Sequence, residues 1–496
     1  MNDLFNAGLD DDKIAVIYEA NKKNMVAINT PDGLTERSLI PKIVLQGDVF
    51  GPIECSVQVD TFGKECLQEN KHLYPYKGLV GVPPLGMVDD ILCVSEYGMS
   101  SIILNSYIKA KTNIKKLQYG VEKCHKMHVG KKTAVCPELY IDEWEIKEVK
   151  DIETGRIDIE DKYKEEVAMD ESDSEKYLGD ILSTNGSNTK NIEARTDKGH
   201  GIVNQIMSIL NEIAFGKYHF EISVILRNFL LISGMLTNAE AWYDVKKSEL
   251  EVLEKVDESL LRQILETPSC TPKEMLYLEM GVLPIRFIIM SRRINYLHYI
   301  LNQPKESLLF RVFKAQLDNP VKNDWIETVK QDFETLNMKL DMDGIKAMSE
   351  LSFKRKVRKA VESEGLKYLN KLKKGDGNNT GHSKVAHIEH KKLEMMDYLK
   401  PNIIAIEKAK FIFLIRNRML DIKNSFKNCY DNLLCIACKD VEETQEHLLA
   451  CKALVDDNIV VDTFPRYDEL FGVELNPKIV IAGVIQTNFK KRKQVK

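Results

Sequence analysis

Two short stretches of the sequence carry side chains suited to binding metal ions, and the first lies near the C-terminal end. Its four candidate ligands follow the pattern Cys435-x2-Cys438-x8-His447-x3-Cys451. Thiolate and imidazole groups are the ligands that tetrahedral Zn²⁺ prefers. Cys435 and Cys438 have the spacing of a tight knuckle, and His447 and Cys451 stand about one helical turn apart, on one face of a helix. The spacing predicts a zinc site.

The second stretch is the aspartate pair Asp89-Asp90, which stands between apolar runs at 85–88 and 91–94. This arrangement predicts a buried β-hairpin with the two carboxylates at its turn. Burying adjacent negative charges costs several kcal/mol per ion unless a cation or a donor compensates them. The pair therefore favours binding of a divalent metal ion. A solvated turn in which the aspartates bind nothing stays open, because turns are rich in aspartate.

The composition limits the number of domains, the kind of nucleic-acid contact and the cellular setting that can be expected. Its 496 residues are enough for two to four domains, and the net charge of −5 excludes a surface that is basic throughout. Basic residues gather near 354–374 and 489–496, so any contact with nucleic acid must be local. The ten cysteines, no signal-peptide pattern and no apolar run of membrane-spanning length favour an intracellular protein without membrane contact. The basic tail at 489–493 is compatible with nuclear import or with phosphate contact.

The N-terminal third predicts short strands alternating with helices. Expected elements are a helix within 1–25, a hairpin formed by 26–29 and 38–45, a helix after the box at 44–52, and a helix at 98–118. Gly47 in that box permits close approach of a ligand, although a plain strand-to-helix turn fits equally well. Lys123 follows in a loop where a lysine is normally solvated. The acidic segment 137–176 predicts a surface hairpin or a partly disordered insertion.

The rest of the chain has the periodicity of long amphipathic helices. They are predicted at 201–214, 220–236, 246–265, 272–281, 284–301, 349–374 and 402–424. The helix at 349–374 is unusually basic, which suits a phosphate backbone and equally suits a solvated helix face. A flexible linker is predicted at 375–383. His382, His387 and His390 near this linker lack suitably spaced partners and are expected at the surface.

Taken in order, these motifs resemble those of reverse transcriptases of non-LTR (LINE-type) retrotransposons. The series consists of VLQGDVFGPIECSVQVD at 44–60, MVDD at 87–90, LQYGVEKCHKMHVG at 117–130, EKYLGD at 175–180, a helical segment and the Cys-Cys-His-Cys group. The helical segment also resembles the family's thumb in SGMLTNAEAWY at 233–243 and in 260–286. The resemblance covers nearly the whole chain.

The resemblance implies roles for individual residues. Gln46 and Gly47 would line the pocket for nucleotide and template. Asp89, with Asp90 beside it, would bind Mg²⁺ (or Mn²⁺), although Met87 and Val88 replace the family's usual aromatic residue and alanine. Lys123 would help to protonate the departing pyrophosphate. Tyr177, Leu178 and Gly179 would grip the primer end, and the implied partners are an RNA template, a DNA primer and dNTPs.

The fold implied is α+β: an incomplete right-hand polymerase palm, then an all-helical thumb and a small zinc-knuckle module. The expected parts are a partial palm at 1–195, a thumb at 196–330, a basic helical region at 331–425, the CCHC knuckle at 426–460 and a C-terminal segment at 461–496.

Two-metal phosphoryl transfer needs carboxylates from two strands. In the family the first of these aspartates lies on a strand upstream of the box that corresponds to 44–60. That strand and the fingers are not found in this sequence, so the chain is expected to be a truncated reverse transcriptase, inactive in isolation. The alternative is a non-catalytic fragment that binds RNA or DNA through the zinc knuckle and the basic segments. An unexpressed relic of such an element also stays open.

Overall fold

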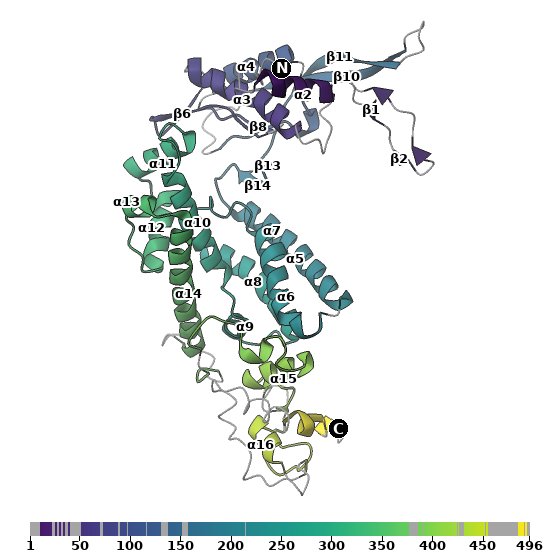
Figure 1. Cartoon of the computed structure of the whole chain (residues 1–496), viewed down its shortest axis with the longest axis vertical. Helices are drawn as coiled ribbons and strands as arrows, with labels where there is room; N and C mark the ends of the chain where they lie inside the picture. The colour runs from purple at the N-terminus through teal and green to yellow at the C-terminus, as the bar shows by residue number, and fades with distance from the viewer. Residues whose placement is uncertain are drawn as a thin grey trace. The chain divides into compact units, whose positions relative to one another are not determined.

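The chain is a mixed α/β protein that is mostly helical, with small two-stranded sheets (Figure 1). The computed structural model describes residues 10–21, 25–26, 29–30, 33–34, 38–39, 51–69, 73–87, 90–96, 98–115, 117–129, 137–150, 157–213, 215–375, 385–388, 390–423, 425, 431–451, 453–454, 485–490 and 492–493. These residues form two compact units, one made of Met1–Asn188 with Pro304–Asn319 and the other of Thr189–Gln303 with Pro320–Lys496.

The first unit begins with the elements that the sequence predicts. Helix α2 (Asp11–Asn21) starts after Asp10, whose carboxylate accepts a hydrogen bond from the Lys13 ammonium at 2.7 Å. Strand β1 (Met25–Val26) pairs with β4 (Ser38–Leu39), and β2 (Asn29–Thr30) pairs with β3 (Gly33–Leu34). The predicted hairpin is therefore confirmed in its described residues.

Two helices provide the packed centre of this unit. Helix α3 (Gly51–Glu69) contributes Phe62, and helix α4 (Gly98–Lys115) contributes Leu104 and Ile108 to one buried apolar cluster. The Tyr107 hydroxyl donates to the Glu65 carboxylate at 2.9 Å, which adds a polar contact between the same helices. The predicted helices after the 44–52 box and at 98–118 are thus confirmed.

Antiparallel hairpins make up most of the remaining first unit. The pairs are β5 (Tyr74–Tyr76) with β6 (Val80–Val82), β7 (Leu85–Met87) with β8 (Asp90–Leu92), β10 (Tyr140–Lys150) with β11 (Ile157–Ala168), and β13 (Ser174–Tyr177) with β14 (Asp180–Ser183). Strands β9 (His125–Lys126) and β12 (Asp170–Glu171) pair in parallel. The long β10–β11 ribbon is the surface hairpin predicted for the acidic segment. Helix α11 (Leu308–Asp318) joins this unit, where the Gln316 amide donates to the Tyr76 hydroxyl at 3.0 Å.

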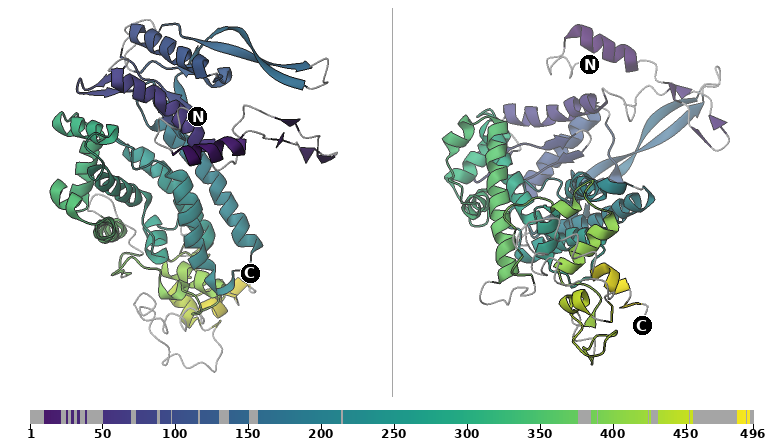
Figure 2. Two further views of the ribbon diagram at one scale, coloured as in Figure 1. Left: turned by 45° about the horizontal axis from the view of Figure 1, so that its top comes forward. Right: turned by 60° about the horizontal axis from the view of Figure 1, so that its bottom comes forward.

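The second unit is helical in its described residues (Figure 2). Its helices are α5 (Thr189–Glu212), α6 (His219–Leu226), α7 (Ser233–Met235), α8 (Lys247–Leu265), α9 (Lys273–Met280), α10 (Ile285–Leu301), α12 (Trp325–Thr335), α13 (Met342–Ala347), α14 (Glu350–Lys374), α15 (Ile406–Arg416) and α16 (Gln445–Ala450). A π-helical turn, η3 (Arg227–Ile232), joins α6 to α7, so the segment predicted as one helix at 220–236 is helical throughout. Helix α15 is shorter than the predicted span of 402–424.

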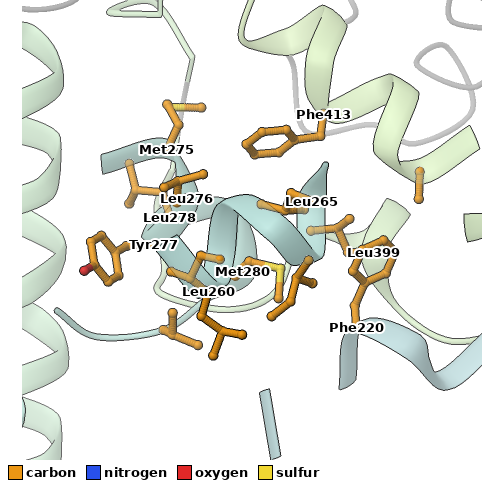
Figure 3. Close-up of a cluster of buried hydrophobic side chains, with 14 of the residues drawn as sticks. Phe220, Leu260, Leu265, Met275, Leu276, Tyr277, Leu278, Met280, Leu399 and Phe413 are labelled. Atoms are coloured by element: carbon orange, nitrogen blue, oxygen red, sulfur yellow. The ribbon is translucent and has the colours of Figure 1, made fainter. Parts of the chain in front are cut away.

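Helices α8 and α9 carry the centre of the second unit's core (Figure 3). Leu260 and Leu265 of α8 and Met275 and Leu276 of α9 are fully buried. Burying a side chain of this size stabilises the fold by about 1.5–3 kcal/mol relative to leaving it exposed. Apolar residues recur along α8 at intervals of three and four residues, so one face of the helix is apolar.

Gly281 ends helix α9 and allows the chain near 394–396 to dock against it. Its φ of +67° lies in the left-handed region, and a Cβ at this position would lie 2.1 Å from the backbone nitrogen of Met395. The backbone N–H of Met396 donates to the carbonyl oxygen of Glu279 at 2.9 Å. Only glycine combines that conformation with so close an approach of another backbone segment.

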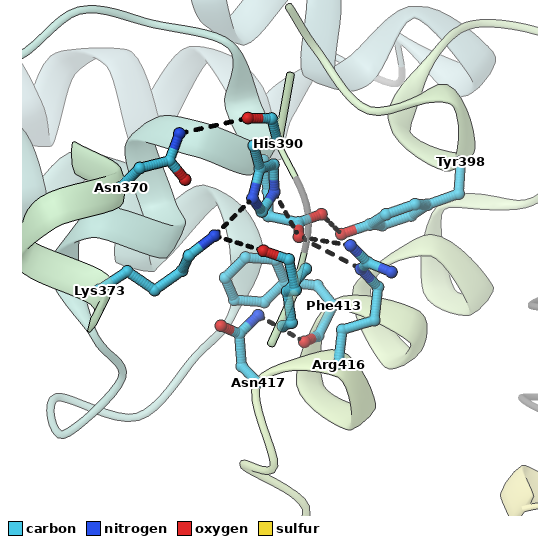
Figure 4. A network of polar contacts seen from close by, with 9 residues as sticks. Asn370, Lys373, His390, Tyr398, Phe413, Arg416 and Asn417 are labelled. Carbon is cyan, nitrogen blue, oxygen red and sulfur yellow. Dashed lines mark hydrogen bonds and ion pairs between the residues drawn. The ribbon is translucent and has the colours of Figure 1, made fainter. Parts of the chain in front are cut away.

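A buried polar network surrounds the Glu279 carboxylate, and it contradicts the expected surface position of His390 (Figure 4). The His390 Nε2 atom lies 3.1 Å from Glu279 Oε1, and the Arg416 guanidinium donates to the same oxygen at 3.0 Å. The Tyr398 hydroxyl donates to Oε2 at 2.5 Å. Burial alone would raise the pKa of Glu279, but Arg416 and the other donors outweigh it and hold that pKa far below its usual value.

Lys373 is the member of the basic helix that this network buries. Its ammonium donates to the carbonyl oxygen of Ile388 and lies 3.4 Å from His390 Nδ1. Burial lowers the pKa of Lys373 to about 8. The other residue near the predicted linker that the structure describes, His387, is exposed as expected, and His382 lies outside the described residues.

No helix within the described residues is both long enough and apolar enough to cross a membrane. The most apolar candidate in the sequence contains Arg227, whose guanidinium forms a buried ion pair with Asp257 at 2.6 Å.

Candidate metal centre

A tight turn positions the first two candidate ligands, Cys435 and Cys438. The backbone N–H of Cys435 donates to the carbonyl oxygen of Val441 at 2.7 Å, and the N–H of Lys439 returns to the carbonyl oxygen of Cys435 at 2.9 Å. Lys439 has a φ of 59°, which reverses the chain directly after Cys438. Both thiols are thereby held on the inside of the turn predicted from the Cys-x2-Cys spacing.

Helix α16 positions the other two ligands. Thr444 is its N-cap, and the threonine hydroxyl accepts a hydrogen bond from the backbone N–H of His447 at 3.0 Å. This cap satisfies a backbone donor that would otherwise lack a partner at the helix start. His447 then lies in the first turn of the helix, and Cys451 follows as its C-cap residue. The sequence prediction of one helical turn between these two ligands is confirmed.

The four ligand atoms converge on one point. All of them lie within 4.8 Å of one another. The Sγ atoms of Cys435 and Cys451 are 3.9 Å apart, and Cys438 Sγ lies 3.2 Å from His447 Nε2. Zinc–sulfur bonds of about 2.3 Å in a tetrahedron place two sulfur atoms about 3.8 Å apart. The group can therefore bind a zinc ion with little movement of its side chains.

The thiols differ in how easily they ionise. Burial raises the pKa of the Cys451 thiol to about 12, and the neighbouring Cys435 adds to this effect. Burial also acts against ionisation of Cys438, but the backbone N–H groups of Asp440 and Val441 donate to its sulfur and lower its pKa. A divalent cation between the sulfur atoms would offset the cost of placing several thiolates together.

A buried ion pair between Glu443 and Arg492 holds the turn that carries Cys435 and Cys438. The Glu443 carboxylate accepts from the backbone N–H groups of Lys423 at 2.9 Å and of Ile436, between the two knuckle cysteines, at 3.3 Å. Its oxygens also bind the Arg492 guanidinium through two hydrogen bonds of 2.7 and 2.8 Å. Asn488 donates to the carbonyl oxygen of Leu448 in α16 at 2.6 Å. The C-terminal helical residues are thus fastened to the metal-binding group.

Sequence reasoning missed this support and assigned the tail a different role. Arg492 was expected within an exposed basic tail, yet its side chain is 1% exposed. The nearby Glu443 at one end of the pair is equally hidden, and no local pattern links two residues that stand 49 positions apart. Glu443 stands directly after Glu442 and close to Glu446, just before the helix that carries His447, so the sequence does not single it out as the buried partner.

The aspartate hairpin is present, but it is not buried. Leu85 pairs with Leu92, Gly86 with Ile91 and Met87 with Asp90, which leaves Val88 and Asp89 as the connecting residues. The Met87 side chain is 55% exposed and Asp90 is exposed. The expectation of a buried hairpin is therefore wrong at its turn end. Ile91 packs on the cluster of Phe62, Leu104 and Ile108, but the two strands pair only with each other and the residues next to the turn are exposed. Asp89 itself lies outside the described residues.

The hairpin expected to grip a primer end lies next to the aspartate hairpin. Leu178 and Gly179 connect β13 to β14 with φ values of 48° and 89°, as a two-residue turn of the I′ type requires. The Tyr177 hydroxyl donates to the carbonyl oxygen of Leu85 at 3.3 Å. Burial and the nearby Asp90 raise the pKa of Tyr177, so its hydroxyl stays protonated and able to donate.

No described contact brings the remaining predicted site residues to the hairpins that carry Asp90 and Tyr177. Lys123 ends the short 3₁₀ helix η1 (Val121–Lys123), where it is exposed. Gln46 and Gly47 lie outside the described residues. A scan of the sequence against protein-family models and a search among curated proteins both find no match.

Proposed function

We propose that this chain is part of a reverse transcriptase of a non-LTR retrotransposon, an RNA-directed DNA polymerase that uses divalent metal ions. In this proposal the hairpin with Asp89 and Asp90 supplies Mg²⁺ ligands, and residues 177–179 hold the primer end. The helical unit and a zinc-loaded Cys435 group hold an RNA–DNA hybrid.

One contact carries the proposal beyond the order of the motifs. The hydrogen bond from Tyr177 to the Leu85 carbonyl joins two hairpins that are 92 residues apart in sequence. A polymerase needs its primer end beside its metal-binding carboxylates, because the attacking 3′-oxygen must lie at the metal ion. The contact between the hairpin with Tyr177 and the hairpin with Asp90 supports the proposal, because it is the neighbourhood that such an arrangement requires.

Helix α14 supplies cations for the hybrid's phosphates. Its buried row, Phe353, Val357, Val361, Gly365, Leu369 and Lys373, repeats every four residues. A second row begins two residues later, about 200° around the helix, and therefore faces away from the core. That outward row consists of Arg355, Lys359, Ser363, Lys367 and Lys371, all of them exposed.

The outward row has the length of a useful backbone contact. Its members rise about 6 Å per step and span about 24 Å. One strand of a duplex presents a phosphate about every 3.4 Å of its axis, so several phosphates come within reach of this row. Each cation that neutralises a phosphate releases a counterion, which makes the binding salt-dependent and indifferent to sequence.

Binding of a blunt RNA–DNA hybrid, followed by fluorescence anisotropy at several salt concentrations, tests the proposal. The zinc-loaded protein is expected to bind the hybrid more tightly than a DNA duplex of equal length. The reason is that an RNA–DNA hybrid, and not a DNA duplex, is the substrate that the proposed function implies. Replacing Arg355 and Lys359 by Gln is expected to reduce the slope of log K against log [salt] by about 2. Absence of salt-dependent hybrid binding would remove the proposal.

A matched control separates position from net charge. Arg358 and Lys314 each form an ion pair four residues along their own helix, with Glu362 and with Asp318, both at 2.7 Å. Changing these two cations to Gln removes the same total charge as the Arg355 and Lys359 variant. The control is expected to keep most of the wild-type salt slope.

A primer-extension assay separates polymerase activity from binding alone. Extension of a DNA primer on an RNA template, dependent on Mg²⁺ and lost in Asp89→Asn, would establish the catalytic form of the proposal. Hybrid binding without extension favours the second candidate, a non-catalytic nucleic-acid-binding protein. The outward row of α14 and the metal-binding group are the observations that favour this second candidate.

A further inference from the structure

A groove of about 760 Å³ lies in the second unit between α10 and the beginning of α14. Its lining includes Tyr296 and Tyr299 from α10 and Phe353 from α14, and its charged members are Glu240, Arg292, Glu350 and Lys354. The volume falls in the range of sites that take nucleotide-sized ligands. None of the site residues expected from the sequence lines this groove.

Two stacked tyrosines form one wall of the groove. The rings of Tyr296 and Tyr299 lie 5.8 Å apart with an angle of 13° between their planes. Trp325 supports Tyr296 from the side by an edge contact at 5.8 Å and 87°. The Tyr299 side chain is 53% exposed, so its outer face is open to a ligand. A ring held in this way loses little conformational freedom when another planar group stacks on it.

The charges of the groove balance one another. Lys354 pairs with Glu350 four residues earlier on α14. The Arg292 guanidinium donates to the backbone carbonyl of Leu236, and the acidic Glu240 influences its pKa, which burial lowers. The groove therefore favours neither an isolated anion nor an isolated cation. A planar neutral group with polar edges suits the tyrosine wall better.

We infer that the groove binds an unpaired base of a single-stranded RNA, stacked on Tyr299. The inference rests on the proposed function, since it assigns the single-stranded part of the template to this place. Lys354 lies in the groove wall, and Arg355, where the outward row of α14 begins, follows it about 100° further around the helix, so a strand that leaves the groove over this edge of α14 meets the cations of that row. Aromatic side chains next to a basic track are the usual means of binding single strands without sequence preference.

The test compares a blunt RNA–DNA hybrid with the same hybrid extended by an RNA overhang of roughly six nucleotides, a length within the usual site size. Tyr299→Leu is expected to weaken binding of the overhang form by about 5- to 150-fold, the loss typical of one stacked base. The same change is expected to leave the affinity for the blunt hybrid as in the wild type. Tyr299→Phe keeps the stacking face and is expected to bind the overhang like the wild type.

Phe229→Leu is the matched control, because Phe229 is an exposed aromatic residue of the same unit, 77% exposed, that does not line the groove. This variant is expected to bind both hybrids like the wild type. Equal binding of the overhang form by Tyr299→Leu and by the wild type overturns the inference. In that case binding of the blunt hybrid would still stand, so the proposed function would survive the loss of the groove.

A single-stranded RNA of roughly six nucleotides that carries 2-aminopurine tests the groove without any hybrid. Stacking on Tyr299 is expected to quench the 2-aminopurine fluorescence in the wild type and in Tyr299→Phe, but not in Tyr299→Leu. Quenching that persists in Tyr299→Leu, or no binding of this RNA to the wild type, overturns the inference even if the chain binds no hybrid.

Discussion

The Glu443 carboxylate and the Arg492 guanidinium form a two-pronged ion pair directly behind the metal-binding turn. Both side chains are essentially inaccessible to solvent, with 0% and 1% exposure. Arginine suits this position because its planar fork matches both oxygens of a carboxylate. The pair couples the C-terminal helical residues to the knuckle that holds Cys435 and Cys438.

Removing one partner of this pair is expected to be costly. Arg492→Met leaves the Glu443 charge buried without its cation, which lowers the free energy of unfolding by about 3–5 kcal/mol. The comparison is Arg358→Met, which breaks an exposed pair with Glu362 and should cost no more than about 1 kcal/mol. Urea unfolding of the zinc-loaded proteins measures both values. Equal effects of the two changes would mean that the pair does not hold the C-terminal residues in place.

Zinc is expected to bind in a ratio of one ion per chain. Cys438→Ser removes a ligand and should release the metal, whereas Cys93→Ser, an exposed cysteine outside the group, should retain it. Because metal binding adds to the stability of the folded form, a chelator should lower the Tm of the wild type. Elemental analysis and thermal melting measure these effects. Retention of zinc by Cys438→Ser would contradict the assignment of the ligands.

Lys373 is expected to make the free energy of unfolding increase with pH in alkaline solution. Its pKa is lowered by burial to about 8, with Lys374 and Arg416 acting in the same direction and Glu279 against them. Between about pH 8 and pH 10.5 the unfolded chain therefore binds more protons at this lysine than the folded chain. Stability must rise with pH across that window.

Urea unfolding at pH 7.5 and pH 9.5 checks the Lys373 prediction against Lys373→Met. The wild type should gain on the order of 1 kcal/mol relative to the variant between these two pH values. A constant difference between the two proteins would show that the lysine keeps an ordinary pKa in the folded state.

Two glycine-to-alanine changes are expected to have opposite effects. Gly281→Ala would place a Cβ 2.1 Å from the Met395 nitrogen at a φ of +67°, so we expect a loss of about 2–6 kcal/mol. Gly201 lies within α5 with nothing within 4 Å of the same added atom. Gly201→Ala should therefore stabilise the protein by about 0.5–1 kcal/mol. Thermal unfolding of both variants measures these changes in stability. A Gly281→Ala variant as stable as the wild type would exclude the tight docking of 394–396 against Gly281.

Local features of the structure could be predicted from the sequence because each depends on residues a few positions apart. The spacing of Cys435, Cys438, His447 and Cys451 indicated one metal-binding group, and apolar periodicity indicated helices such as α8 and α10. The hairpin around Asp89 followed from its flanking apolar runs. Its chemical role, and the roles of Lys123 and of 177–179, rest on the resemblance and stay predictions.

Burial of polar side chains was decided only by the tertiary structure. His390 and Arg492 looked like surface residues, yet their partners are Glu279, 111 positions away, and Glu443, 49 positions away. The prediction for the aspartate hairpin was wrong in the opposite direction, since its apolar flanks suggested burial whereas Met87 and Asp90 are exposed. Local patterns report which side chains share a face, but a charged group is buried only where distant segments bring it a partner.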